Sequence, residues 1–303
     1  MHRYPFEETA LTSLLGSRNL LTAKVVVSET YVSGFDVLMA QGGAFEFVKT
    51  VPDETFQLVA TSLPGMPSKE HPEFHNYLES QEKVLKEFVR VLKPGGSLCL
   101  QSSKCVNRKE IYPLDLFLYP LVRKNPNMQL RNRIVWFRDR RQDERGRLRD
   151  GYQPVLWFTK GHRYTFNLDA VRTPQKYPDK KYFRGPKKGQ LSCNPLGKNP
   201  GDAWEVLKVK ADYPDPLDSW VQLPIHVARR LVLAMSNQGD VVFDPFAGTG
   251  SILLAGILLG RRVVGVNSQK RYARISERRI NQAIQGKLTV RDLYETKENL
   301  TAY

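Results

Sequence analysis

The sequence predicts an α/β protein built on a mostly parallel sheet with helices on both faces. Two observations lead to this fold class. Short apolar runs alternate with segments of helical periodicity along much of the chain, which is the pattern of βαβ units. A glycine-rich turn, AGTGS at 247–251, joins one apolar run directly to a helical segment, as at the ligand-binding edge of an open α/β sheet. The chain has 303 residues, enough for one large domain or two modest ones.

The N-terminal part contains the first expected βαβ unit. Residues 1–34 have weak patterning apart from one helix expected at 8–17. The following elements are then expected in order: a short helix at 44–51, a buried strand FQLVATS at 56–62, a loop that includes HPEFH at 71–75, a helix at 76–92 stopped by KPGG, and a strand at 97–103.

The middle of the chain is less regular. Residues 111–124 predict a helix, and the runs RNRIVWFRD at 131–139 and PVLWFTKG at 154–161 predict two strands. Residues 165–202 are rich in Pro, Gly, Lys and Asn, with weak periodicity. They predict a long loop or a small subdomain, and long loops in compact proteins are usually functional.

The C-terminal third has the clearest periodicity. The expected elements are an amphipathic helix at 223–237, a turn and strand at 238–246, a helix at 252–260 closed by a glycine, a strand RRVVGVN at 261–267, and a basic helix at 268–287. We expect the RRINQ stretch of the last helix to be a solvated face.

The net charge of +15, from 46 Lys and Arg against 31 Asp and Glu, predicts a polyanionic partner, with nucleic acid the usual one. Fifteen of the basic residues but only six acidic ones lie between Arg138 and Lys188, and aromatic residues are interleaved with them. Cations for phosphates and flat rings for bases suit a nucleic-acid surface. A solvated charged loop is the alternative.

Other features narrow the class of protein. No stretch approaches about 18 apolar residues, and the N-terminus lacks the apolar core of a secretory signal, so we expect a cytoplasmic protein without a membrane span. Three widely spaced cysteines predict free thiols. The two histidines of HPEFH have no further ligand nearby in the sequence to complete a set, so we expect no metal site.

The glycine-rich turn is the strongest single candidate for a ligand site. In VVFDPFAGTGS, Gly248 and Gly250 stand between a strand and a helix, where a backbone without Cβ atoms lets a ligand approach. The turn lacks the GK[ST] ending of a phosphate loop. Asp244, at the end of the strand, could hold a cationic ligand group. A turn that serves only packing is the alternative.

These motifs together resemble the S-adenosyl-L-methionine (SAM)-dependent DNA amino-methyltransferases of the N4-cytosine and N6-adenine type, in the order that places the catalytic motif before the SAM motif. FDPFAGTGS is similar to the family's SAM loop, and FQLVATSLPG is similar to its catalytic strand and loop. EKVLKEFVRVLKPGGSLCLQ, NPGDAWEV and QLP resemble downstream elements. The resemblance runs from about residue 42 to 285 and implies a Rossmann-like methyltransferase fold with a basic target-recognition insertion.

The resemblance also implies roles for particular residues. The target base would be flipped out of double-stranded DNA, with its exocyclic amine held by the catalytic loop Ser62, Leu63, Pro64 and Gly65. The SAM site would include Phe243, Asp244, Pro245, Phe246, Gly248, Gly250, Asn267 and Gly43. DNA would be contacted by Arg138, Arg140, Arg141, Arg145, Arg147, Arg149, Lys187 and Lys188. A serine in first place favours N4 of cytosine over N6 of adenine.

The implied organisation has three parts. Residues 1–137 form the N-terminal part of the methyltransferase domain with the catalytic loop, 138–203 the basic target-recognition region, and 204–303 the C-terminal part with the SAM loop. Such proteins serve restriction-modification systems of bacterial, archaeal or phage type, and a dimer or a partner methyltransferase subunit is possible.

Several pocket positions depart from the family's pattern. Leu63 replaces a proline, Gly65 an aromatic residue that stacks on the base, and Asn267 an acidic residue that binds the ribose. Gly43 replaces an aspartate, and Ser219-Trp220 replaces His-Pro before QLP. Leu63 keeps the carbonyl of the proline but not its fixed φ. With glycine at 65 a base stack is lost, which costs about 1–3 kcal/mol, and we expect the loop to become more flexible.

The departures leave two hypotheses open: a divergent active enzyme, in which Met66, His71 or Phe74 supplies the missing surface, and a catalytically inactive relative that binds DNA or a partner subunit. A basic RNA methyltransferase is a third hypothesis, against which the motif order and NPGDAW argue.

Overall fold

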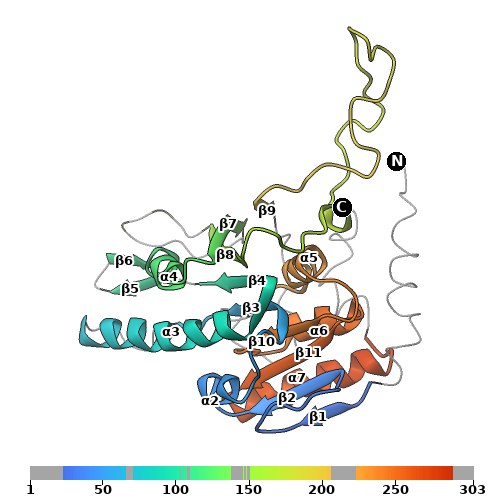
Figure 1. The fold of residues 1–303 in the computed structure, drawn as a ribbon. Helices are drawn as coiled ribbons and strands as arrows, with labels where there is room; N and C mark the ends of the chain where they lie inside the picture. Colours follow the sequence, from blue (N-terminus) through green and yellow to red (C-terminus); the bar gives the residue numbers. More distant parts are fainter. Residues whose placement is uncertain are drawn as a thin grey trace.

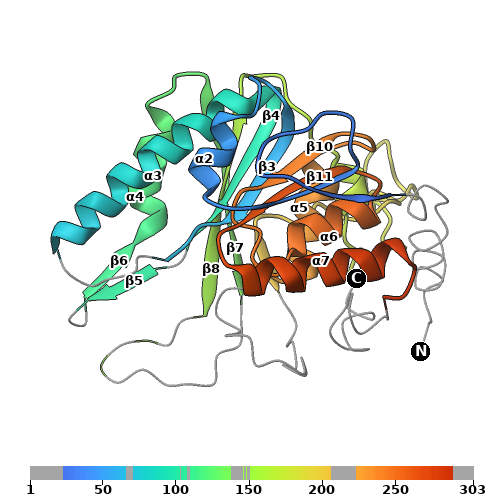
Figure 2. The same ribbon diagram turned by 90° about the horizontal axis from the view of Figure 1, so that it is seen from below.

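The computed structural model describes residues 23–65, 71–102, 104–107, 110–137, 146, 148, 151–205 and 223–288. It contains a nine-stranded sheet in the order β1-β2-β11-β10-β3-β4-β8-β7-β9 (Figures 1 and 2). Its strands are β1 (Val25–Val27), β2 (Val37–Gln41), β3 (Phe56–Ser62), β4 (Leu92–Gln101), β7 (Met128–Phe137), β8 (Tyr152–Lys160), β9 (Ala203–Glu205), β10 (Val241–Asp244) and β11 (Arg262–Asn267). The predicted α/β fold with a mostly parallel sheet is confirmed.

The strands from β1 to β4 in this order are all parallel to one another, whereas β8 is antiparallel to both β4 and β7. Strand β10, from the C-terminal third, lies between β11 and β3 and pairs with both. Segments from the N-terminal and C-terminal thirds therefore build one continuous sheet, and the carboxyl ends of these six neighbouring strands lie on the same side of it.

Helices cover both faces of this sheet. On one face lie α2 (Ala44–Lys49), α3 (His71–Val91) and α4 (Leu114–Arg123), and on the other lie α5 (Ile225–Met235), α6 (Ser251–Leu258) and α7 (Lys270–Ile284). Successive side chains along each strand point to opposite faces of the sheet, so each strand contributes to the hydrophobic core on both faces. In β10, for example, Val242 packs toward α5 and α6, while Phe243 packs on the opposite face, its ring 4.5 Å from that of Phe56.

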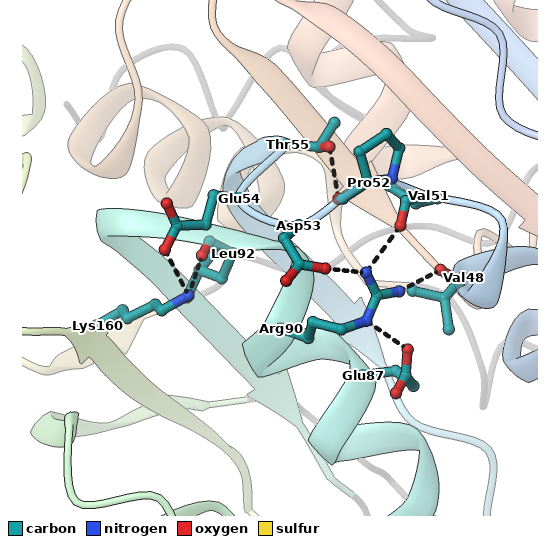
Figure 3. A network of polar contacts seen from close by, with 10 residues as sticks. All are labelled: Val48, Val51, Pro52, Asp53, Glu54, Thr55, Glu87, Arg90, Leu92 and Lys160. Atoms are coloured by element: carbon teal, nitrogen blue, oxygen red, sulfur yellow. Dashed lines mark hydrogen bonds and ion pairs between the residues drawn. The ribbon is translucent and has the colours of Figure 1, made fainter.

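An arginine network lies at the amino-terminal ends of the strands, opposite the carboxyl ends just described (Figure 3). The Arg90 guanidinium donates hydrogen bonds to the carbonyls of Val48 and Val51 and to the carboxylates of Asp53 and Glu87. These bonds tie the end of α3 to the turn between α2 and β3. The turn that leads into β3 is therefore held by the side chain of Arg90, which is distant in sequence.

The structure differs from the expected elements in several places. Sequence reasoning does not identify β1 and β2, both within 23–41. HPEFH is not a loop, because α3 begins at His71. KPGG ends the helix as expected, but its residues belong to β4. A Cβ atom on Gly96 would lie 2.9 Å from the Gln57 carbonyl oxygen, so only glycine allows β4 to approach β3 this closely.

The predicted helix at 111–124 also begins later than expected. Its first residues belong instead to a hairpin of β5 (Lys104–Asn107) and β6 (Glu110–Pro113), and Pro113 stands directly before the first turn of α4. The predicted long loop at 165–202 is confirmed, apart from a 3-10 turn at Leu168–Val171, and it extends away from the sheet in Figure 1.

The helix expected at 8–17 lies outside the described residues. The three cysteines are free thiols, as predicted. Within the described part of the chain, no helix is long and apolar enough to cross a lipid bilayer.

Candidate functional site

The candidate site lies at the edge of the sheet where parallel strands β2, β11, β10, β3 and β4 end side by side. Their carboxyl ends are Gln41, Asn267, Asp244, Ser62 and Gln101. Adjacent strands lie about 4.8 Å apart, so the residues predicted for the catalytic loop and for the SAM site come together from distant parts of the sequence. In open α/β sheets this edge is where ligands bind.

The glycine-rich turn after β10 is shaped by helix α7. Gly250 has a φ of 82° and precedes the first turn of α6. A Cβ atom there would lie 2.3 Å from the Ser276 hydroxyl oxygen of α7, which requires glycine at this position. Arg279 is buried and donates a 2.8 Å hydrogen bond to the Thr249 carbonyl. The expectation that the whole RRINQ stretch is solvated is therefore wrong for Arg279, which supports the turn.

Asp244 is buried at the start of this turn. Its Oδ1 accepts hydrogen bonds from the Thr61 hydroxyl at 2.6 Å and from the Phe246 backbone N–H at 3.2 Å. Burial raises the pKa of Asp244 to about 7, although both hydrogen bonds favour the charged form and lower it in part. A carboxyl group with such a pKa can accept a cationic ligand group at little further desolvation cost.

The remaining residues predicted for the turn fall into two groups. Phe243 is fully buried and its ring belongs to the core, so its side chain does not face the edge. Phe246 is partly buried and packs edge-on to Phe88 at a ring distance of 6.3 Å. Pro245 is buried, and Gly248 has a φ of 51°, with the Phe246 carbonyl oxygen 3.9 Å from the place of a Cβ atom, an ordinary van der Waals contact.

Asn267 and Gly43 lie on the other side of the turn. The Asn267 carbonyl accepts a 2.9 Å hydrogen bond from the Gly42 N–H, which joins the ends of β11 and β2. The Asn267 side chain is 5 % exposed, and among the described residues its Nδ2 has no hydrogen-bond acceptor. A Cβ atom on Gly42 or Gly43 would meet nothing within 4 Å. A buried donor beside open backbone fits a ligand that carries hydroxyl or ring-nitrogen acceptors.

The loop after β3 is held by contacts at three of its residues. Ser62 pairs with Gln101 of β4, and the Leu63 N–H donates a 2.9 Å hydrogen bond to the Gln101 carbonyl. The Leu63 side chain is 5 % exposed and packs in the core under α3. The Pro64 carbonyl accepts a 3.1 Å hydrogen bond from the Tyr77 hydroxyl. The loop that was expected to be loose is therefore anchored without a proline at 63.

Tyr77 and Gln101 are residues that sequence reasoning missed. Burial raises the pKa of Tyr77 to about 12, with a smaller contribution from Cys105, so its hydroxyl stays protonated at physiological pH and donates a hydrogen bond. Gln101 is 4 % exposed and donates to Gln153 Oε1 at 2.5 Å, while its own Oε1 has no donor in the described part of the chain. The signal for Gln101 was a polar residue at the end of a buried strand.

Gly65 leaves space where an aromatic residue would stand, because a Cβ atom there meets nothing within 4 Å. Of the three suggested replacements, Met66 lies outside the described residues and the side chain of His71 is not described. Phe74 lies one turn before Tyr77 on α3, but its ring packs against Tyr112 at 5.2 Å and Phe117 at 4.9 Å. Phe74 is thus engaged in an aromatic cluster of its own.

Two of the predicted DNA-binding residues can be placed. Lys187 and Lys188 are exposed near the outer end of the long loop at 165–202. The other six, Arg138, Arg140, Arg141, Arg145, Arg147 and Arg149, lie outside the described residues.

A family model described as DNA methylase, of the N6 and N4 type, matches residues 25–278. The chain belongs to this DNA amino-methyltransferase family. The match spans the eleven strands and the helices α2 to α6 of the described residues, and it ends within α7.

Curated relatives of the family include two Type II methyltransferases. M.BglII of Bacillus subtilis is 35 % identical over 239 residues, which cover 78 % of this chain and 66 % of the relative. M.ScaI of Streptomyces caespitosus is 29 % identical over 277 residues, which cover 88 % of both chains. The DNA adenine methyltransferase YhdJ of Escherichia coli K12 is 27 % identical, covering 80 % of this chain and 82 % of the relative.

Solved structures of the family share the fold. The putative DNA modification methylase TTHA0409 of Thermus thermophilus, complexed with SAM, has 25 % identity and a TM-score of 0.61, covering 82 % of this chain and 94 % of the neighbour. The cytosine-N4-specific PvuII DNA methyltransferase has 15 % identity and a TM-score of 0.63, covering 88 % of this chain and 97 % of the neighbour. The Rossmann-like methyltransferase fold is thereby confirmed.

Proposed function

We propose that this chain transfers a methyl group from SAM to an exocyclic amine of a base in double-stranded DNA, with N4 of cytosine as the favoured target. One observation carries the proposal. The loop Ser62–Gly65 and the glycine-rich turn after Asp244 leave adjacent parallel strands at the same edge, and the Thr61–Asp244 hydrogen bond joins them there. A donor and an acceptor bound on these two loops would be held side by side.

The residues around the turn fit the cofactor. Asp244 offers a carboxyl group for the amino group of SAM, Asn267 a buried amide for a ribose hydroxyl, and Gly43 and Gly248 leave room for the backbone to approach it. When bound, SAM supplies an electrophilic methyl group on a sulfonium. The complex of TTHA0409 with SAM supports this choice of ligand.

The catalytic loop would position the amine. The lone pair of an exocyclic amine is conjugated with the ring, so the nitrogen is a poor nucleophile. Two acceptors, the Ser62 hydroxyl and the Leu63 carbonyl, would bind its two hydrogens and favour a pyramidal nitrogen. They also stabilise the positive charge that develops there, so catalysis rests on positioning and electrostatics. The anchored backbone at Leu63 and Pro64 supports this role, because the acceptors are fixed before the base arrives.

The base would reach this loop by leaving the duplex, since an amine within paired DNA cannot be approached in this way. The open space beside Gly65 leaves the loop without its own stacking surface. We therefore infer weaker binding of the flipped base than an aromatic residue would give, with a cost of about 1–3 kcal/mol. Basic residues in the target-recognition region 138–203 would bind the phosphates.

The test is direct detection of the product. Purified protein is incubated with radiolabelled SAM and unmethylated genomic DNA, and the hydrolysed nucleosides are separated. We expect N4-methylcytosine. Ser62→Ala should lower the rate about 10-fold or more, whereas Ser33→Ala, at an exposed position between β1 and β2, should leave it unchanged. N6-methyladenine as the product would overturn the choice of base, and equal rates in both variants would overturn the role of Ser62.

The inactive DNA-binding relative is the second candidate, favoured by the departures at Gly65 and Asn267. It predicts DNA binding without label transfer under any condition. A Gly65→Tyr variant separates the two, since the open space at this position accepts a ring. If the wild type transfers label and the variant lowers KM for DNA, the site is a weakened active site. If neither protein transfers label while both bind DNA, the inactive form is correct.

A further inference from the structure

Residues 172–198 form an arm, which extends away from the sheet in Figure 1. Its base is a short antiparallel pairing: the Thr173 N–H donates to the Lys198 carbonyl at 3.0 Å, and the Lys198 N–H donates to the Thr173 carbonyl at 2.8 Å. Gly197 has a φ of 105°, and a Cβ atom there would lie 2.4 Å from the Thr173 carbonyl oxygen. The close pairing of Thr173 with Lys198, where the arm begins and ends, therefore requires glycine at 197.

The outer end of the arm is paired as well. Lys181 forms an antiparallel bridge with Leu191. The Tyr182 N–H donates to the Gln190 carbonyl at 2.9 Å, and the Gly189 N–H donates to the Tyr182 carbonyl at 3.0 Å. The arm thus ends in a closed turn at 183–188, which we call the tip. Backbone pairing at both ends gives the arm a defined shape without a core of its own.

The tip combines one exposed ring with several cations. The side chain of Phe183 is 81 % exposed. The Arg184 guanidinium lies 5.8 Å from the Phe183 ring centroid, and Lys187 and Lys188 complete the turn. Within 172–198 there are eight Lys and Arg and one acidic residue, Asp179, which gives a net charge of 8 − 1 = +7. A large apolar ring exposed at the end of a cationic arm indicates a binding contact. The ring becomes buried when a polyanion binds the surrounding cations.

We propose that the tip is a separate duplex-binding element, in which Phe183 inserts between base pairs while Arg184, Lys187 and Lys188 bind the flanking phosphates. The inference rests on the proposed function in one respect, namely that the polyanion is DNA. Apolar side chains inserted at a base step, beside cations on the backbone, partly unstack and bend the duplex. Such a contact would hold the DNA at a second point besides the methylated base.

The charge of the arm decides between the two occupants that could cover the ring. A second copy of this chain would bring its own cationic arm and a net charge of +15, so an arm-to-arm contact is repelled. A duplex supplies phosphates for the cations and an apolar base stack for the ring. Only the duplex satisfies both kinds of group at the tip.

The experiment measures binding of the full chain to an unmethylated duplex of about 30 base pairs at several salt concentrations, together with the bend of the duplex by energy transfer between its ends. Phe183→Ala should weaken binding about 5- to 100-fold at every salt concentration and reduce the bend, without changing the salt slope. Replacing Arg184, Lys187 and Lys188 by serine should reduce the slope by about one for each phosphate that the variant no longer binds. Leu196→Ala removes an exposed apolar side chain from the arm outside the tip and is the matched control.

The outcomes separate this inference from the proposed function. Wild-type affinity, slope and bend in Phe183→Ala would overturn the role of the ring, even if methyl transfer is intact. Self-association that Phe183→Ala abolishes would assign the ring to a second copy instead. The protein could also bind DNA in a way that depends on Phe183 and yet transfer no label. That result would support the role of the tip in DNA binding and contradict the proposed methylation. Because Phe183 packs in no core, circular dichroism and thermal unfolding of the variant should match the wild type.

Discussion

The Thr61 hydroxyl donates a 2.6 Å hydrogen bond to Asp244 Oδ1, although the two residues are 183 positions apart. Thr61 stands one residue before the loop that begins at Ser62, and Asp244 ends the strand before the glycine-rich turn. Both side chains are buried. The bond therefore joins the loop that begins at Ser62 to the glycine-rich turn that follows Asp244.

The first prediction concerns pH and stability. Burial raises the pKa of Asp244 to about 7 in the folded state, from 3.8 for an exposed group. Between about pH 4 and pH 7 the folded protein thus binds a proton that the unfolded chain has lost, so this contribution to stability is complete below about pH 4 and is lost as the pH rises through about 7. The free energy of unfolding of the ligand-free protein should fall by up to about 1.4 kcal/mol per pH unit in this window.

Asp244→Asn is the control for this prediction, because it keeps the shape of the side chain and does not titrate. Denaturant unfolding at several pH values gives the comparison. The difference in stability between the two proteins should change over about pH 4 to 7, and parallel pH profiles would show that Asp244 does not have a raised pKa.

The second prediction concerns the cofactor. Asn267→Ala removes a buried amide whose Nδ2 has no acceptor among the described residues, and should weaken SAM binding about 2- to 10-fold. Asn267→Asp offers an acceptor that is charged and should bind a ribose hydroxyl more tightly than the amide does. Gln282→Ala, on the exposed face of α7, should have no effect. Calorimetric titration measures all four proteins, and equal affinities would remove Asn267 from the site.

The third prediction concerns the anchor of the catalytic loop. Tyr77→Phe removes the 3.1 Å hydrogen bond to the Pro64 carbonyl but keeps the packing of the ring. If the bond positions the loop, kcat should fall about 2- to 10-fold while KM for SAM is unchanged. Tyr119→Phe, an exposed tyrosine on α4, is the matched control. A fall in stability with kcat unchanged would instead make Tyr77 a purely structural residue.

The fourth prediction concerns the Arg90 network at the amino-terminal ends of the strands. Arg90→Met keeps the aliphatic stem but removes the donors to two carbonyls and two carboxylates. The free energy of unfolding should fall by about 2 kcal/mol, because buried acceptors lose their donors while the exposed ion pair with Asp53 contributes little. Lys86→Met, on the exposed face of the same helix, should change stability by less than about 0.5 kcal/mol.

Much of the sheet was predictable because its strands are buried on both faces. FQLVATS and VVFDPF are continuous apolar runs between turn residues, and these became β3 and β10. Strand β1 was missed because it has only three residues, is partly exposed and stands at the edge of the sheet. The hairpin of β5 and β6 was missed because EIYP reads continuously into the helix that follows.

The candidate site was predictable to a different extent for each residue. The residues that resemble the family's motifs, from Ser62 to Gly65 and from Asp244 to Gly250, come together at one edge. Tyr77 and Arg279 were not assigned to the site, because each acts through a backbone carbonyl of another segment. Such contacts leave no spacing pattern in the sequence.

By itself, the sequence determined the α/β fold class, the two loops that resemble the family's catalytic and cofactor motifs, and the cationic character of residues 138–188, because periodicity, glycine positions and charge are local properties. Only the tertiary structure decided how the catalytic loop is held without a proline at 63, and that Thr61 and Asp244 are joined by a buried hydrogen bond. Both depend on strand order, and neighbours in a parallel sheet are set by packing across the whole chain.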